Sequence, residues 1–263
     1  MAVCTTFAAP PIALQNLPAL PLVAGPLLGL LSREDVSFNE VSRLLSTDAG
    51  LAAEVLRLAN SPLGGRFGAT TILQALCLLG LARVHNLILT LTMSALLKGL
   101  KGSAVLRCCW RHNLASALIA RKIASTMNVD ADLAYMAGLM HDIGRLALLA
   151  ANPVVYAAIM ANPSHKREDE KRRLGLDHCE AGAWVVVHWK LPVILADVAL
   201  KHHDPLVSPG SLTHLIHVAC EVASQMGFGV EGGEDCEMQA VVDDQLRIEV
   251  ATAINAIEIH CGC

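Results

Sequence analysis

The chain has 263 residues, of which 54% are hydrophobic and 17% are charged, so it can bury a substantial core and is not expected to be disordered over most of its length. Its formal net charge is −4, and aromatic residues make up only 3% of the sequence. These values argue against direct nucleic-acid binding, which needs a concentrated positive face and aromatic side chains for base stacking.

The first 32 residues contain no charged side chain, a pattern that signal and membrane segments share. This stretch lacks the basic start of a secretory signal. It is also interrupted by Pro10, Pro11, Pro18, Pro21 and Pro26, whereas a membrane-spanning helix needs about 20 continuous apolar residues. The nine cysteines include no Cys-x-x-Cys pair. We therefore expect a cytoplasmic protein with reduced cysteines and no membrane segment.

Helical signals dominate the first part of the chain. Capping-box patterns start at Ser37 and at Thr71, each just before apolar residues at helical spacing. The helix after Thr71 is expected to end near Gly80, and residues 81–98 continue as a strongly apolar helix.

The second part of the chain continues this pattern. His112 shares a predicted helix face with Ser116 and Ile119, and residues 131–150 are predicted to form one helix rich in small residues. The charged run from Lys166 to Arg173 is interpreted as a solvated helix. A third capping box starts at Asp177.

The last predicted helices follow from similar signals. Pro192 suits the first position of a helix that ends at His202 and His203. Ser211 opens another helix, and an amphipathic helix runs from Val242 to Ile257. Alternating patterns typical of strands are not evident, so the predicted fold class is all-α.

Five histidines and one aspartate on these predicted helices are of the ligand types that divalent metals of intermediate softness select. They are His112, His141, Asp142, His178, His202 and His203. Neighbouring helix residues project about 100° apart, so the adjacent His-Asp pair can share a ligand only over the edge between two helix faces. The other histidines would complete a metal site in the core of a helix bundle. Alternatively, each histidine is an ordinary core residue, or interacts with the end of a helix dipole.

At these residues the chain resembles the HDOD family, the HD-related output domains of bacterial signalling proteins. The resemblance rests on several motifs: Leu17-Pro-Ala-Leu-Pro21, Leu56-Arg-Leu-Ala-Asn-Ser61, Trp110-Arg-His112, Ala137-Gly-Leu-Met-His-Asp-Ile-Gly144, Asp177-His178, Trp189-Lys-Leu-Pro192 and His202-His203. It implies a helical N-terminal bundle packed on a helical HD-type core.

The resemblance covers nearly all of residues 15–228, which we expect to be one HDOD domain. Residues 1–105 would include the N-terminal helical part of this domain, and residues 106–228 would form its HD-type core. Residues 229–263 would form a linker and a C-terminal helix.

Catalytic relatives of this family are HD phosphohydrolases and the HD-GYP phosphodiesterases that cleave cyclic di-GMP. By resemblance, metal ligation falls on the six residues above, and Asp142 would bridge two ions. The expected cofactor is one or two divalent ions of iron, manganese or zinc. The chain departs from the enzymes at Cys220, where they carry an aspartate, and at Arg145, where they usually carry lysine. It also lacks a Gly-Tyr-Pro element after His203.

Two functional hypotheses follow. In the first, the protein is a regulatory module that acts by binding a signalling protein, whose identity the sequence does not reveal, and it retains a residual metal site. In the second, it is a metal-dependent phosphohydrolase that acts on a cyclic dinucleotide or a nucleotide. The departures favour the first, because a thiolate can replace a carboxylate as a metal ligand more easily than as part of a hydrolytic centre.

Overall fold

Every element that the computed structural model describes is a helix, which confirms the all-α prediction. The structure describes residues 10–15, 17, 23–33, 35–61, 68–98, 103–162, 167–204, 206–230 and 244–261. Most of the expected motif at residues 17–21 and most of the linker at residues 229–243 lie outside these ranges.

The helices of the first part are η1 (Ile12–Leu14), α1 (Ala24–Leu31), α2 (Phe38–Leu45), α3 (Ala49–Ala59), α4 (Ile72–Leu79) and α5 (Leu81–Lys98). The helices of the second part are α6 (Ala104–Ile123), η3 (Ala124–Met127), α7 (Ala131–Met140), α8 (Ile143–Ala151), α9 (Pro153–Met160), α10 (Arg167–Leu174), α11 (His178–His188), α12 (Val193–Lys201), α13 (Leu212–Ala223), η4 (Ser224–Phe228) and α14 (Asp244–Cys261).

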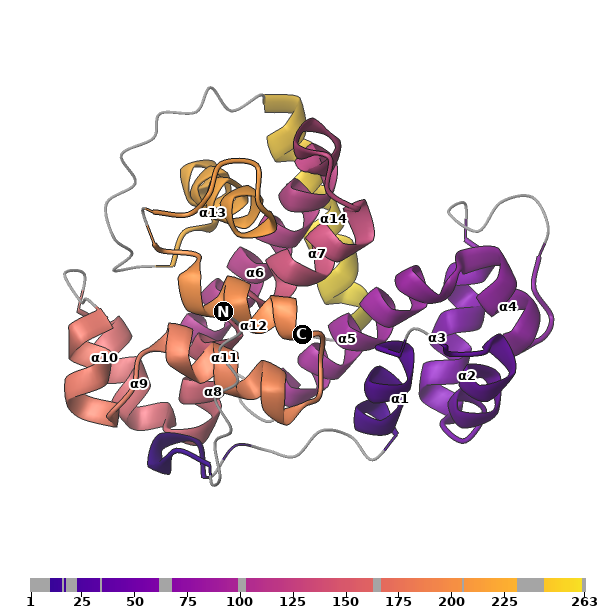
Figure 1. Ribbon diagram of the computed structural model, residues 1–263, viewed down its shortest axis with the longest axis horizontal. Coiled ribbons are helices and arrows are strands. Elements are labelled where there is room, and N and C mark those ends of the chain that lie inside the picture. The colour runs from indigo at the N-terminus through magenta and orange to yellow at the C-terminus, as the bar shows by residue number, and fades with distance from the viewer. Residues whose placement is uncertain are drawn as a thin grey trace.

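The helices form two groups (Figure 1). Helices α1 to α4 lie together at one end, and α5 leads from them into the larger group formed by α6 to α14. Buried apolar side chains from both groups belong to one continuous core. The smaller group therefore packs on the larger one through a shared hydrophobic interior.

The capping boxes predicted at Ser37, Thr71 and Asp177 are all present. In each, the side chain of the first residue accepts a hydrogen bond from the backbone three residues later, and the Glu or Gln there bonds back to the first residue's backbone. At Asp177 this fixes the start of α11, so that His178 is its first residue. Local sequence therefore sets the position of one predicted site residue.

Glycines allow the helices of the larger group to approach closely. A methyl group added at Gly144 in α8 would lie 1.8 Å from the backbone oxygen of His178, and one at Gly138 in α7 would lie 2.6 Å from the Cα of Ala117. Because neither backbone neighbour can move without shifting a helix, these positions require glycine. Close contact between α8 and α11 brings His178 next to the His141-Asp142 pair.

The predicted single helix at residues 131–150 is wrong, because the chain breaks between α7 and α8. His141 follows the last residue of α7, and Asp142 adopts φ −111° and ψ 21°, outside the helical range. Hydrophobic periodicity continues through the break on both sides and hides it. As a result, His141 and Asp142 are not held 100° apart on one helix and can approach the same point.

In the part of the chain that the structure describes, no single helix is long and apolar enough to cross a membrane. Helix α4 and the first part of α5, Ile72–Leu79 and Leu81–Ser94, meet the length and composition requirement only as a pair, and they are bent by 107°.

Candidate metal centre

The six residues predicted from the sequence converge in one buried region between α6, α7, α8, α11 and the end of α12. Ring centroids are 5.2 Å apart for His112 and His141, 4.9 Å for His141 and His202, and 5.3 Å for His178 and His203. Five of the six residues are at most 3% exposed, and His203 is half-buried. Residues that lie between positions 112 and 203 of the sequence therefore meet at one place.

The first cluster consists of His112, His141 and Cys220. Nε2 of His112 lies 3.3 Å from Nε2 of His141 and 3.3 Å from Sγ of Cys220. All three possible ligand atoms lie within 4.8 Å of one another. Cys220 comes from α13 and is the position at which the resemblance predicted a departure from the HD-type enzymes.

Hydrogen bonds orient the imidazoles of the first cluster. Nδ1 of His112 lies 3.0 Å from the carbonyl oxygen of Phe228, and Nδ1 of His141 lies 2.7 Å from that of Gly138. Because a carbonyl oxygen only accepts, each Nδ1 carries the proton, and in the neutral ring the lone pair is on Nε2. Burial lowers the pKa of both histidines, that of His141 well below its ordinary value, so both rings are neutral.

The geometry of the first cluster fits a metal ion. Two neutral imidazoles whose Nε2 lone pairs face each other at 3.3 Å have no proton to share. Tetrahedral zinc with bonds of about 2.0–2.1 Å to nitrogen separates two such atoms by about 3.3–3.4 Å. Since the observed distance agrees with this value, the donor set and its spacing suit a divalent metal of intermediate softness.

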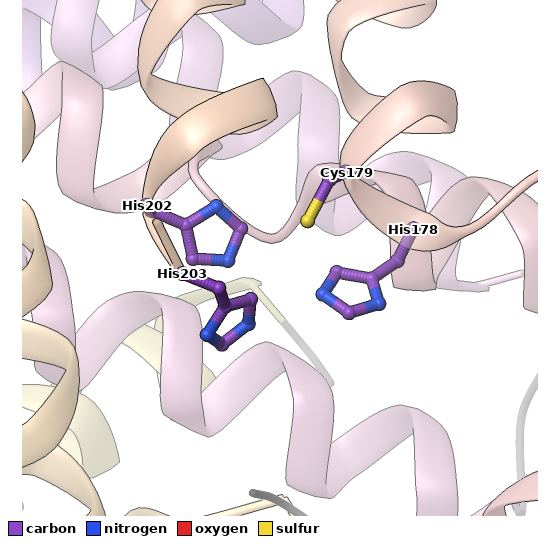
Figure 2. A group of neighbouring side chains, drawn as sticks. All are labelled: His178, Cys179, His202 and His203. Carbon is purple, nitrogen blue, oxygen red and sulfur yellow. The ribbon is translucent and has the colours of Figure 1, made fainter. Parts of the chain in front are cut away.

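The second cluster consists of His178, Cys179, His202 and His203, whose side chains come from the start of α11 and from the residues that follow α12 (Figure 2). The imidazoles and the thiol face a shared space. Nδ1 of His202 lies 2.9 Å from the carbonyl oxygen of Ala199, which again directs Nε2 inward. Cys179 was not among the predicted ligands, because a lone cysteine beside His178 gives no distinctive spacing.

Asp142 lies between the two clusters. Its Oδ1 atom is 3.5 Å from Nε2 of both His178 and His202, and its Oδ2 atom accepts a hydrogen bond of 2.7 Å from Nε of Arg145. Burial alone would raise the pKa of Asp142, but Arg145 and the surrounding histidines hold it well below its ordinary value. The carboxylate is therefore ionised, and its Oδ1 atom, which has no hydrogen-bond partner in the described part of the chain, can act as a ligand.

Arg145 is also buried at this centre. Its Nη2 atom lies 3.2 Å from Nε2 of His178, and its Nη1 atom lies 3.4 Å from Oε1 of Glu170. Burial and Arg145 would lower the pKa of His178, but Cys179 and the carboxylates of Asp142 and Glu170 outweigh them and raise it to about 10. Arg145 and His178 therefore share the same two carboxylates, those of Asp142 and Glu170.

Glu170 is a site residue that the sequence interpretation missed. It lies in α10, in the charged run read as a solvated helix, but its side chain is fully buried. Its Oε2 atom accepts hydrogen bonds of 2.7 Å from both the backbone nitrogen and Nδ1 of His178, and Tyr156 donates to Oε1 at 2.8 Å. Burial alone would raise the pKa of Glu170, but these bonds and charges lower it to about 2.

Three solved structures are similar to this chain. One is an HDOD domain protein of unknown function from Geobacter sulfurreducens, with 26% identity, a TM-score of 0.68, and coverage of 94% of this chain and 93% of that chain. A candidate phosphohydrolase from Shewanella amazonensis SB2B has 25% identity, a TM-score of 0.67, and coverage of 96% and 89%. A candidate signal transduction protein from Marinobacter aquaeolei VT8, at 22% identity and a TM-score of 0.66, shows the fold alone; the match covers 94% of this chain and 59% of that one.

A curated relative, an uncharacterized protein from Treponema pallidum, is 25% identical over 215 residues. The match covers 77% of this chain but spans only 40% of the relative. The HDOD domain family itself matches residues 17–205, which include both halves of the fold and all six predicted ligands. The chain therefore belongs to the HDOD family.

Proposed function

We propose that this chain is a regulatory HDOD protein that acts by binding a signalling partner, and that a single divalent metal at the first cluster stabilises its core. The observation that carries the metal proposal is the facing pair of Nε2 lone pairs on His112 and His141, with the Cys220 sulfur at the same distance from His112. Two imidazoles and a thiolate favour zinc or iron over manganese, which prefers oxygen ligands. Asp142, whose ligand atoms lie within 4.8 Å of those of His141 and His202, would add an oxygen ligand.

Burial supports a structural rather than a catalytic metal. A hydrolytic metal needs an open coordination position that substrate and water can reach. Here His112, His141 and Asp142 are each at most 3% exposed, and a carbonyl oxygen of the segment after α13, that of Phe228, bonds to His112. A cyclic dinucleotide would have to displace this segment to reach the metal. This argues against the alternative, a metal-dependent phosphohydrolase.

The same proposal places the protein in the cytoplasm with a protein partner. A thiolate ligand is stable in a reducing compartment, where free cysteines are not oxidised to disulfides. The formal net charge of −4 disfavours direct binding to nucleic acid.

Elemental analysis and an activity assay test this proposal together. The purified protein is expected to contain one equivalent of metal and to leave cyclic di-GMP and a generic phosphodiester intact when manganese is added. His141→Ala should abolish metal binding and lower the melting temperature, because a metal that binds only the folded state at 100 times its Kd stabilises it by about 2.7 kcal/mol.

His188→Ala is the matched control. His188 is an exposed histidine of α11 that stacks on Trp184 and is remote from the ligand set, so metal content should stay at one equivalent. Equal melting temperatures with and without metal would contradict the structural role. Metal-dependent hydrolysis that disappears in Asp142→Ala would establish the phosphohydrolase instead.

A further inference from the structure

We propose that Arg145 takes the place of a second metal ion, so that its guanidinium limits this centre to one metal. The inference rests on the proposed function, because it assumes that the first cluster binds a metal. It concerns the second cluster, where four possible ligands, His178, Cys179, His202 and His203, lie together but a charged side chain already contacts one of them.

Arg145 uses the atoms that a second metal would need. Its Nε atom donates to Oδ2 of Asp142 at 2.7 Å, and its Nη2 atom contacts Nε2 of His178 at 3.2 Å. Nδ1 of His178 is bound to Glu170 at 2.7 Å, so both nitrogens of this ring are engaged. A metal ligated by His178 must displace either Arg145 or Glu170.

Distance makes the competition direct. A metal bonded to Nε2 of His178 would lie about 2.0–2.1 Å from that nitrogen, in the region where the Nη2 atom now lies at 3.2 Å. The guanidinium cannot withdraw easily, because it is 6% exposed and is also held by Glu170. Metal and guanidinium therefore exclude one another at this position.

The buried charges around Arg145 also argue against a second metal ion. Asp142 and Glu170 carry two buried negative charges, and Arg145, which is always protonated, supplies one positive charge between them. Arg145 therefore already offsets part of the negative charge that would attract a second metal ion. Adding a divalent ion beside the guanidinium would place like charges next to each other in a medium that screens them poorly.

The test compares metal content after incubation with excess zinc and dialysis. Wild type should retain one equivalent. Arg145→Met, which has a side chain of similar length without charge or donors, should retain two, because His178 and Asp142 then become available. Arg173→Met, which changes an exposed arginine of α10, should stay at one.

A second variant tests the same inference without changing Arg145. In His178→Gln the amide can still donate a hydrogen bond toward Glu170, and one equivalent of zinc should remain, because His178 does not ligate the first metal. Loss of zinc from His178→Gln, two equivalents in wild type, or one equivalent in folded Arg145→Met would each overturn the inference.

These outcomes separate the two proposals. If wild type and Arg145→Met both bind one equivalent, only the role of Arg145 is wrong. If neither binds zinc, the metal site of the proposed function is wrong as well. Hydrolysis by wild type would refute the regulatory function, while the zinc content would still decide the role of Arg145.

Discussion

The two clusters contain the same kinds of side chain but differ in what holds them. In the first cluster, backbone carbonyl oxygens orient His112 and His141, and their lone pairs face one another. In the second, a buried glutamate and a buried arginine hold His178. Imidazole and thiol groups at close range therefore do not define a metal site by themselves. The clusters differ in that both ring nitrogens of His178 are already bound by charged side chains, whereas His112 and His141 are held only through Nδ1 by backbone carbonyl oxygens.

The largest expected effect comes from breaking the charged group that holds the second cluster. Glu170→Gln removes the carboxylate that pairs with Arg145 and accepts two hydrogen bonds from His178. Removing one partner of a buried ion pair costs about 3–5 kcal/mol, because the remaining charge stays buried without compensation. We expect a loss of this size in the free energy of unfolding, measured with urea at pH 7.

Glu168→Gln provides the control on the same helix. Glu168 is exposed, and surface substitutions of this kind change stability by about 0.5 kcal/mol or less. Equal stabilities of the two variants would mean that Glu170 contributes no more than a solvated residue, and the contrast between the clusters would be lost.

Glu170 also shows where the sequence pattern stops being informative. Capping boxes at Ser37, Thr71 and Asp177 depend on neighbours three residues away, and all three were predicted correctly. The burial of Glu170 depends on partners in α8, α9 and α11, and no periodicity within a charged run reports it.

Some features of the site could likewise be predicted from the sequence, and others could not. Convergence of the six predicted residues could be anticipated, because their side-chain types and the family resemblance both pointed to one centre. The break that places His141 and Asp142 together could not, because helical periodicity persists on both sides of it. Arg145 was noticed as a departure from related enzymes, but its contacts with Asp142 and His178 arise only from packing.

The next largest effect concerns the thiol of the first cluster. Cys220→Ser keeps a similar shape but replaces a soft ligand with a poor one, since thiolates bind zinc much more strongly than hydroxyl groups do. We expect zinc affinity to fall by at least about 10–100-fold, the range that even the loss of an outer-shell partner costs. Competition with a chelator of known affinity would measure this. Cobalt-substituted wild type should also show a thiolate absorption band that the variant lacks.

Cys108→Ser is the corresponding control. Cys108 lies on α6, the helix that carries His112, but its side chain is exposed. Its replacement should leave zinc affinity and the cobalt spectrum unchanged. An unchanged affinity in Cys220→Ser would instead show that the first cluster binds metal through its imidazoles without the sulfur.

The last prediction concerns a buried histidine outside both clusters, and it tests the effect of burial without metal ligation. His85 lies in α5, and burial lowers its pKa to about 4. The folded state therefore keeps this ring neutral between about pH 6.5 and 4, whereas the unfolded chain protonates it. As pH falls through this window, wild type should lose up to about 1.4 kcal/mol per pH unit of unfolding free energy relative to His85→Leu, and below pH 4 the loss should level off.

Urea unfolding of both proteins at pH 7, 6 and 5, in the presence of a chelator, measures the difference. Parallel pH profiles would show that His85 is solvated in the folded state, and that burial in this core does not by itself keep an imidazole neutral.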